Sequence, residues 1–306
     1  MPPSNNSVVL LSAPHTPFHP DGSVHLEVID RQAEHLLCHR INGVFINGTT
    51  GESHSLTIAE RQAIALRWCE VTRGTSLSVI IHVGSNCLDD AESLARHAAH
   101  LGVAAIAAIS PSYFKPRSVA DLIECAIRIA AAAPATPFYL YDIPSMTGVN
   151  LSMPEFLEQA RDRIPNLKGL KYSNPDLLAY QHCVNADGGR WDVPWGSDES
   201  LLAALVMGGR TAVGSTYNFA APIYHRLVAA FFRGDLETAR LEQFRSAQTV
   251  QTLMRHGFMG AAKALMRHLG IAVGTTRLPL ANPTPAQEAA LIGELGRLGF
   301  FDWIRA

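Results

Sequence analysis

The stretch Leu-Lys-Gly-Leu-Lys-Tyr-Ser, residues 167–173, ends a short apolar run with a lysine, in a chain that has only four lysines against 21 arginines. Side chains alternate along a strand, so Gly169, Lys171 and Ser173 share one face. Lys168 has the opposite parity. Burial disfavours the charged form of a lysine and lowers its pKa, and a neutral amine can form a Schiff base with a ketone. Lys171 is thus a candidate nucleophile; the alternative is a lysine whose ammonium group simply reaches solvent.

Tyr141 ends the preceding apolar run, Pro-Phe-Tyr-Leu-Tyr, and shares a face with Tyr139. A phenol at that position could carry protons between a lysine-bound carbon and a substrate oxygen. The alternative is a core tyrosine with a satisfied hydroxyl group.

An earlier run ends in Ile-Asn-Gly-Thr-Thr-Gly-Glu-Ser, residues 46–53. Its turn offers backbone N–H groups and the hydroxyls of Thr49 and Thr50, with Gly48 and Gly51 on either side. Such a turn before a helix can hold a carboxylate. An ordinary Gly/Thr loop is the alternative.

Two acids, Asp198 and Glu199, follow Trp-Gly-Ser at residues 195–197. They could bind the hydroxyls of a sugar or polyol, or they could be acids that the dipole of a following helix favours. Most of the 13 histidines lack the spacing of metal ligands, so the sequence predicts no metal site.

The elements that must position these residues alternate between short apolar runs and helical periodicity. The expected strands are Val8–Ala13, Gly43–Asn47, Leu77–His82, Ala104–Ser110, Pro137–Tyr141, Leu167–Lys171, Trp191–Trp195 and Thr211–Gly214. The expected helices between them include Leu26–His39, Ile58–Val71, Asp89–His100, Val119–Ala132, Pro154–Ile164 and Glu199–Met207, with start signals at Thr57 and Ser152.

Eight strands alternating with helices predict an α/β fold, a (β/α)8 TIM barrel, whose chemistry gathers at the carboxyl ends of the strands. The rival, an open doubly wound sheet, usually carries a glycine-rich phosphate turn, and no G-x-G-x-x-G sequence occurs here. The pattern after residue 231 is wholly helical, over Asp235–His256, Phe258–Leu269 and Pro285–Leu298. We therefore expect a catalytic barrel over residues 1–230 and a C-terminal helical extension over residues 231–306.

Composition narrows the possible partners. Hydrophobic residues make up 47% and charged residues 17%, and the net charge is −2, which favours neither a nucleic acid nor a membrane partner. Five cysteines without a C-x-x-C pair suit a reducing compartment, and the amino terminus lacks a signal-peptide pattern. The expected location is the cytoplasm.

Taken together, NGTTGESHSLTIAER, YDIPSMTG, GLKYS, WGSDE and GSTYN resemble the motifs of the dihydrodipicolinate synthase/N-acetylneuraminate lyase superfamily. The resemblance runs from TPFHPDG near the start to KALMRHLG and TTRLPL near the end. It implies a (β/α)8 barrel with a C-terminal helical domain, a homotetramer built as a dimer of dimers, and an imine between a strand-6 lysine and pyruvate or another 2-keto acid. No cofactor is implied beyond that imine.

The resemblance also implies roles for single residues. Lys171 matches the Schiff-base lysine, Tyr141 the proton-transfer tyrosine, and Thr49 the hydroxyl that relays to it. Thr49 and Thr50, beside Gly48, match the carboxylate site. Tyr113, in SPSYFKP, resembles a tyrosine that takes part near a neighbouring subunit's active site. The residues matched to binding of the sugar hydroxyls are Gly196, Asp198, Glu199 and Ser215.

Within the superfamily the lyase branch is the nearer match. Dihydrodipicolinate synthases carry an arginine where this chain has Met146, so lysine biosynthesis is not expected. Asp142 replaces the usual asparagine and Ser197 replaces an aromatic residue, while His54 and Ser55 match no pattern. The resemblance implies a polyhydroxylated 2-keto acid such as N-acetylneuraminate as the substrate class, and within that class these departures count against N-acetylneuraminate itself.

The resemblance thus implies a lyase that joins or separates pyruvate and an aldehyde. Two alternatives stay open: a dehydratase of 2-keto-3-deoxy sugar acids that uses the same lysine imine, and a catalytically silent relative that binds a keto acid.

Overall fold

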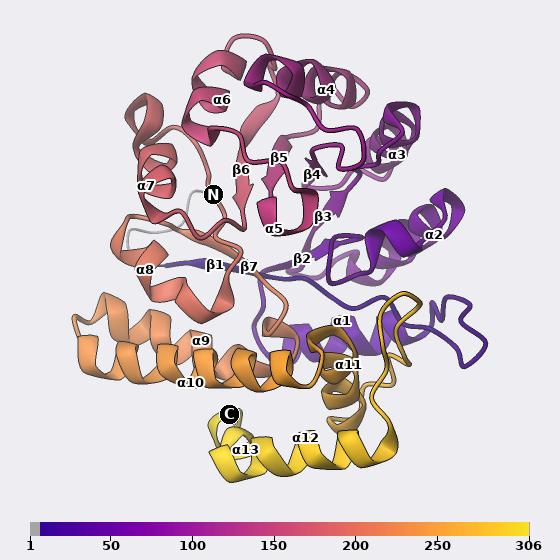
Figure 1. The fold of residues 1–306 in the computed structure, drawn as a ribbon, viewed down its shortest axis with the longest axis vertical. Helices are drawn as coiled ribbons and strands as arrows, with labels where there is room; N and C mark the ends of the chain where they lie inside the picture. Colours follow the sequence, from indigo (N-terminus) through magenta and orange to yellow (C-terminus); the bar gives the residue numbers. More distant parts are fainter. Residues whose placement is uncertain (1–6, 306) are drawn as a thin grey trace.

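The computed structural model describes residues 7–305, so the prediction about a signal peptide falls partly outside the described residues. Parallel strands form one curled sheet in the order β6-β5-β4-β3-β2-β1-β7 (Figure 1). The strands are β1 Val9–Ser12, β2 Gly43–Ile46, β3 Ser78–His82, β4 Ala105–Ile109, β5 Phe138–Asp142, β6 Leu167–Tyr172 and β7 Thr211–Gly214. The predicted (β/α)8 barrel class is confirmed.

The expected strand at Trp191–Trp195 is present only as isolated bridges, which close the barrel between β6 and β7. The amide of Asp192 donates to Lys168 and that of Gly196 donates to Tyr172. Regular pairing would need a further hydrogen bond from the amide of residue 194, halfway between these two donors. That residue is Pro194, which has no N–H group. Pro194 therefore interrupts regular pairing along residues 191–195, while the barrel stays closed.

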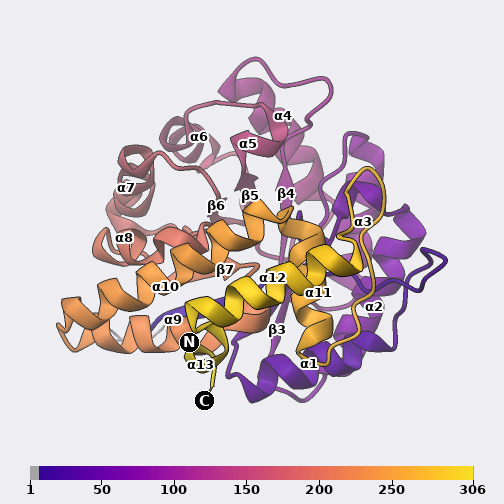
Figure 2. The same cartoon turned by 60° about the horizontal axis from the view of Figure 1, so that its bottom comes forward.

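Helices cover the outside of the barrel and continue into the C-terminal extension (Figures 1 and 2). They are α1 Val28–Cys38, α2 Ile58–Thr72, α3 Leu88–His100, α4 Val119–Ala131, α5 Pro144–Thr147, α6 Met153–Ala160, α7 Leu177–Asn185, α8 Leu201–Val206, α9 Tyr217–Phe232, α10 Leu236–Arg255, α11 Phe258–His268, α12 Pro285–Leu298 and α13 Phe300–Trp303, with short 3₁₀ turns η1 Ser53–Ser55, η2 Ala186–Gly189 and η3 Asp198–Ser200. None of the helices in residues 7–305 combines the length and apolar character needed to cross a membrane.

Local signals explain most helix starts. Thr57 and Ser152 begin α2 and α6 as predicted: Thr57 forms a capping box with Glu60, and Ser152 caps α6. The sequence analysis did not predict α7, although Asp176 caps it by accepting a hydrogen bond from the amide of Ala179 at 2.9 Å. That acid before an apolar pair was a usable start signal.

The core has two layers. The larger lies between the sheet and the surrounding helices, as burial of parallel strands on both faces requires. The smaller fills the barrel and consists of Leu11, Ala13, Phe45, Ala105, Ala107, Ile109, Tyr139, Tyr141, Ile143 and Val213. Small alanines on β4 leave room for the aromatic rings of β2 and β5, so the phenol of Tyr141 reaches the upper end of the barrel interior.

The helices from α9 onward gather on one side of the barrel, where α9 and α10 pack against each other and against α8 (Figures 1 and 2). Helix α9 ends at Phe232, two residues beyond the boundary expected at residue 230. The division into two domains stays a prediction.

Candidate active site

Lys171 and Tyr141 lie side by side at the carboxyl ends of β6 and β5, where the strand register pairs them directly. Lys171 is 5% exposed and Tyr141 4% exposed. The Nζ atom of Lys171 lies 3.6 Å from the centre of the Tyr141 ring and 4.9 Å from that of Phe45, and it donates to the Oγ of Ser173 at 3.2 Å. The amine thus points into the barrel, as the strand parity predicted.

Gly169 lies two residues before Lys171 on β6, and its lack of a side chain has a structural reason. In the structure a Cβ atom there would lie 1.7 Å from the backbone oxygen of Asp192. The missing side chain therefore allows β6 to approach the segment that closes the barrel.

The pKa of Tyr141 lies below its ordinary value. Burial by itself raises this pKa, but the positive charge of Lys171 and hydrogen bonds from Lys171, Thr49 and Ser173 together outweigh burial. The phenol is therefore suited to giving and taking a proton beside the amine.

The turn after β2 brings two hydroxyl groups to this pair. The Oγ1 of Thr49 lies 3.3 Å from the Oη of Tyr141, and the Oγ1 of Thr50 lies 2.6 Å from the Oγ of Ser215. Residues from β2, β5 and the loop after β7, far apart in sequence, thus converge on one point above the barrel. Hydroxyls and amides around that point suit a carboxylate.

The same turn is anchored from below by a buried ion pair. The Oε1 of Glu52 lies 2.6 Å from the Nζ of Lys263, and neither side chain is exposed. Lys263 also donates to the carbonyls of Thr16 and Thr275 at 2.8 Å each, and the amide of Arg277 donates to the other oxygen of Glu52 at 2.8 Å. Burial lowers the pKa of Lys263 to about 8, against the opposing effect of Glu52. The C-terminal extension therefore holds the loop at the site, a contact that sequence reasoning did not predict.

Asp198 is turned inward. It is 6% exposed and accepts hydrogen bonds from the amide of Thr216 at 2.8 Å and from its hydroxyl at 2.7 Å. Burial raises the pKa of Asp198 to about 7, against the lowering effect of these bonds. A chain of hydroxyls continues from Thr216 through Tyr224 to Ser246 on α10. Asp198 thus ties the site to the extension.

The predicted sugar-binding residues do line a common cavity of about 210 Å³. Glu199 is exposed at its rim, unlike its neighbour Asp198. The cavity is lined by Gly196, Asp198, Glu199, Ser215, Val250, Met254 and Phe258. The last three come from α10 and α11, and the sequence analysis missed them because nothing local indicates where the extension packs.

A second cavity, of about 350 Å³, is lined in part by Thr49. Its lining includes Met146, which is 62% exposed, and the unassigned pair His54 and Ser55. Met259, Pro279 and Leu280 of the extension complete the wall. Met146, which stands where dihydrodipicolinate synthases carry an arginine, therefore faces a mostly apolar cavity.

Tyr113 is the predicted site residue that the structure does not bring to the others. It is 78% exposed and its ring contacts Phe114 edge-on, with ring centres 5.0 Å apart. Its amide donates to Asn86 at 3.0 Å. A role for Tyr113 beside another subunit's site stays a prediction.

Asp142, the departure beside Tyr141, is buried with 6% exposure and accepts a hydrogen bond from the side chain of Asn174 at 2.9 Å. Burial raises the pKa of Asp142 to about 6, and the bond from Asn174 opposes this rise. The residue supports the loop after β6, because its carbonyl accepts from the amide of Ser173 at 2.8 Å.

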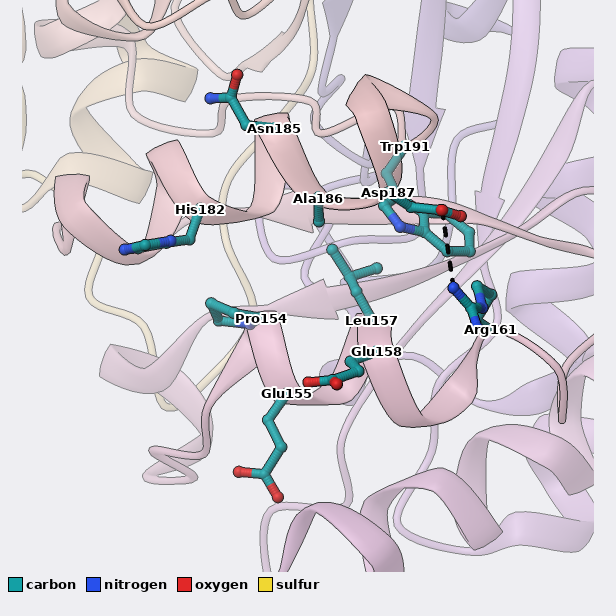
Figure 3. Close-up of a pocket in the computed structure, with 10 residues that line it drawn as sticks. All are labelled: Pro154, Glu155, Leu157, Glu158, Arg161, His182, Asn185, Ala186, Asp187 and Trp191. Atoms are coloured by element: carbon teal, nitrogen blue, oxygen red, sulfur yellow. Dashed lines mark ion pairs between the residues drawn. The ribbon is translucent and has the colours of Figure 1, made fainter.

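Two other features lie apart from this centre. A groove of about 490 Å³ runs between α6 and α7, where Arg161 pairs with Asp187 at 3.7 Å and the side chains of Glu155 and His182 point in different directions (Figure 3). On the hairpin before α1, His19, His25 and Glu27 bring potential metal ligand atoms within 4.8 Å of one another. Neither feature includes a residue predicted for catalysis.

Comparison with known proteins agrees with the motifs. Residues 6–293 match the sequence profile of the dihydrodipicolinate synthetase family. The chain is 39% identical over 284 residues to an N-acetylneuraminate lyase of Gallus gallus, covering 92% of each protein. The structure of an N-acetylneuraminate lyase from Aliivibrio salmonicida superposes with a TM-score of 0.93 at 41% identity, covering 97% of this chain and 98% of that one. A sialic acid aldolase from Ruminococcus gnavus, solved as a catalytic lysine mutant, superposes with a TM-score of 0.91 at 26% identity over 98% of both chains.

Proposed function

The chain belongs to the dihydrodipicolinate synthetase family, and on that premise we propose that it is a class I aldolase that cleaves N-acetylneuraminate, or a closely related sugar acid, into pyruvate and an aldehyde. The observation that carries the proposal is the buried amine of Lys171, held 3.6 Å from the ring centre of Tyr141 at the carboxyl end of β6. The carbon–carbon lyases among its relatives support the same reaction class.

In the first step the amine of Lys171 attacks the keto carbon, C2, and the keto oxygen leaves as water with a proton from the phenol of Tyr141, which gives an iminium ion and a phenolate. The phenolate of Tyr141 then takes the proton of the C4 hydroxyl. The electrons of the C3–C4 bond move into the iminium ion, so an aldehyde departs and an enamine remains. Protonation at C3 and addition of water to the imine release pyruvate and restore the lysine.

In this proposal, different residues bind the two ends of the substrate. The hydroxyls of Thr49 and Thr50 and nearby amides hold the carboxylate, and Thr49 keeps the phenol of Tyr141 in line. Glu199 at the rim of the neighbouring cavity takes hydroxyls of the sugar tail, while Asp198 positions the loop that carries it.

The proposal includes no metal and no organic cofactor, because the iminium ion itself accepts the electrons of the broken bond. It also includes a homotetramer, for which the exposure of Tyr113 and Phe114, 78% and 85%, is the support in this chain. A cytoplasmic location belongs to the same proposal and is supported by five free thiols. Light scattering after size exclusion measures the assembly directly.

The test is reduction with borohydride in the presence of pyruvate, followed by peptide mass spectrometry. We expect a pyruvate adduct on Lys171 of the wild type and none in Lys171→Ala. Lys168→Ala is the matched control, because it removes an exposed lysine from the same strand and keeps the adduct. Release of pyruvate from N-acetylneuraminate then identifies the cleavage, whereas an unsaturated or deoxy keto acid would identify the dehydratase. Absence of any adduct in the wild type refutes the proposal.

A further inference from the structure

A buried polar cluster contacts Asn47 at the start of the turn after β2, the turn that carries Thr49 and Thr50. The cluster plays no part in the chemistry described above. At its centre is His82, the last residue of β3, which is 1% exposed. Around it lie Asn47 at the start of the turn, Ser53 in η1 and Arg61 on α2, with 2%, 6% and 2% exposure. Polar groups this deeply buried are costly unless each has a partner, so their arrangement is informative.

The partners of His82 fix its protonation. The amide of Ile109 lies 3.3 Å from Nε2, and because an amide can only donate, Nε2 accepts. Nδ1 therefore carries the proton and donates to the carbonyl of Asn47 at 2.9 Å. Arg61 approaches the same Nδ1 at 3.4 Å, but its guanidinium donates instead to the carbonyl of His82 at 2.7 Å. Burial and this guanidinium hold the pKa of His82 well below its ordinary value, which agrees with a neutral ring.

The carbonyl that His82 holds belongs to an unusual backbone position. Asn47 has a φ of 58°, in the left-handed region that few residues other than glycine adopt. Its side chain donates to the carbonyl of Arg61 at 2.9 Å, so the residue is held from both sides. This bend turns the chain from β2 toward Thr49 and Thr50. A strained backbone persists only where its surroundings fix it.

We infer that His82 is a positioning residue for the carboxylate of the 2-keto acid, acting through the Asn47 carbonyl on the turn that carries Thr49 and Thr50. The inference rests on the proposed function. The ring of His82 packs edge to face against that of Tyr141, with ring centres 6.0 Å apart, but both of its nitrogens are engaged by backbone groups and are not free to act on the reacting atoms. Its loss should therefore weaken binding of the keto acid and leave binding of the sugar aldehyde alone.

The test is a set of three substitutions, assayed in the direction of synthesis with pyruvate and the N-acetylated sugar aldehyde varied separately. His82→Phe keeps an aromatic ring and removes the hydrogen bonds of the imidazole to Asn47, Ser53 and Ile109. We expect KM for pyruvate to rise at least tenfold while KM for the aldehyde changes less than twofold. His82→Asn can still donate to Asn47, so we expect it to recover most of the loss. The longer side chain of His82→Gln places its polar group near the amide of Ile109, so it cannot donate to the carbonyl of Asn47. This variant should therefore behave like His82→Phe.

The outcomes separate clearly. An unchanged pyruvate KM in folded His82→Phe overturns the inference, and so does a parallel rise in both KM values. If His82→Phe does not fold, the Asn and Gln variants decide, because a merely structural role predicts no difference between them in pyruvate KM. His97→Phe on α3 is the control for loss of a histidine. Within residues 7–305 the one hydrogen-bond partner of the His97 ring is the carbonyl of Gln62, at 3.3 Å. A wild type that forms no pyruvate adduct would refute the proposed function instead.

Discussion

Replacement of Asp142 by asparagine is expected to stabilise the protein at neutral and alkaline pH. The carboxylate of Asp142 is buried, and within residues 7–305 no salt bridge compensates its charge. Its hydrogen bond from Asn174, at 2.9 Å, can be accepted equally by the oxygen of an asparagine amide. The substitution therefore removes a charge from the interior and keeps the contact and the volume.

The magnitude follows from the pKa of Asp142, raised by burial from 3.8 to about 6. One pKa unit corresponds to about 1.4 kcal/mol, so ionised Asp142 lowers the free energy of unfolding by about 3 kcal/mol at pH 8. Between pH 3.8 and 6 the folded protein binds more protons than the unfolded chain, so the stability contributed by this group falls as pH rises. At pH 5 the carboxyl is largely protonated in the fold, and the cost is about half as large.

The assay is urea denaturation of the wild type and Asp142→Asn at pH 5, 6.5 and 8. We expect a gain in free energy of unfolding that grows with pH and reaches about 3 kcal/mol at pH 8. Asp162→Asn, which changes an acid whose side chain is 81% exposed, controls for the loss of one negative charge. A gain that does not depend on pH, or a loss at pH 8, would show that burial does not govern the ionisation of Asp142.

Three further perturbations test the site and its supports. Tyr141→Phe is expected to lower kcat by about 10²–10⁴ while borohydride still traps pyruvate, because only proton transfer is lost; equal loss of trapping would contradict this. Lys263→Met should lower the free energy of unfolding in urea by about 3–5 kcal/mol by leaving Glu52 charged and unpaired, and adding Glu52→Gln should recover part of the loss. Gly169→Ala would set a methyl group 1.7 Å from a backbone oxygen and should prevent normal folding, as judged by yield and circular dichroism, whereas Gly293→Ala, with its nearest neighbour at 3.5 Å in α12, should fold normally.

The sequence was most informative where one strand and its parity decide a side chain's position. Lys171 faces the barrel because alternation along β6 leaves no other choice once Leu170 packs under the helices. The meeting of Lys171, Tyr141 and Thr49 follows from parallel strands, whose carboxyl ends share one edge. These contacts required no knowledge of how the helices pack.

The remaining features depend on long-range packing that local patterns do not encode. Lys263 lies in an apolar helical pattern that gives no sign of its pairing with Glu52. Val250 and Phe258 belong to the extension, and their place at the cavity beside Asp198 depends on how α10 and α11 pack on the barrel. The strand predicted at Trp191–Trp195 is reduced to isolated bridges for a local reason, since Pro194 in an apolar run was a warning against regular pairing.

The contact between the extension and the turn after β2 has a consequence during protein synthesis. Arg277 lies 225 residues beyond the Glu52 carboxylate that accepts its amide, and Lys263 lies 247 residues beyond Thr16. Chains fold progressively as they leave the ribosome, so the barrel strands are available long before these partners exist. The strands of the barrel can therefore form first, but the turn that carries Thr49 and Thr50 gains its anchor only when the last helices arrive. Translation that stalls before residue 263 should leave this turn without the ion pair between Glu52 and Lys263.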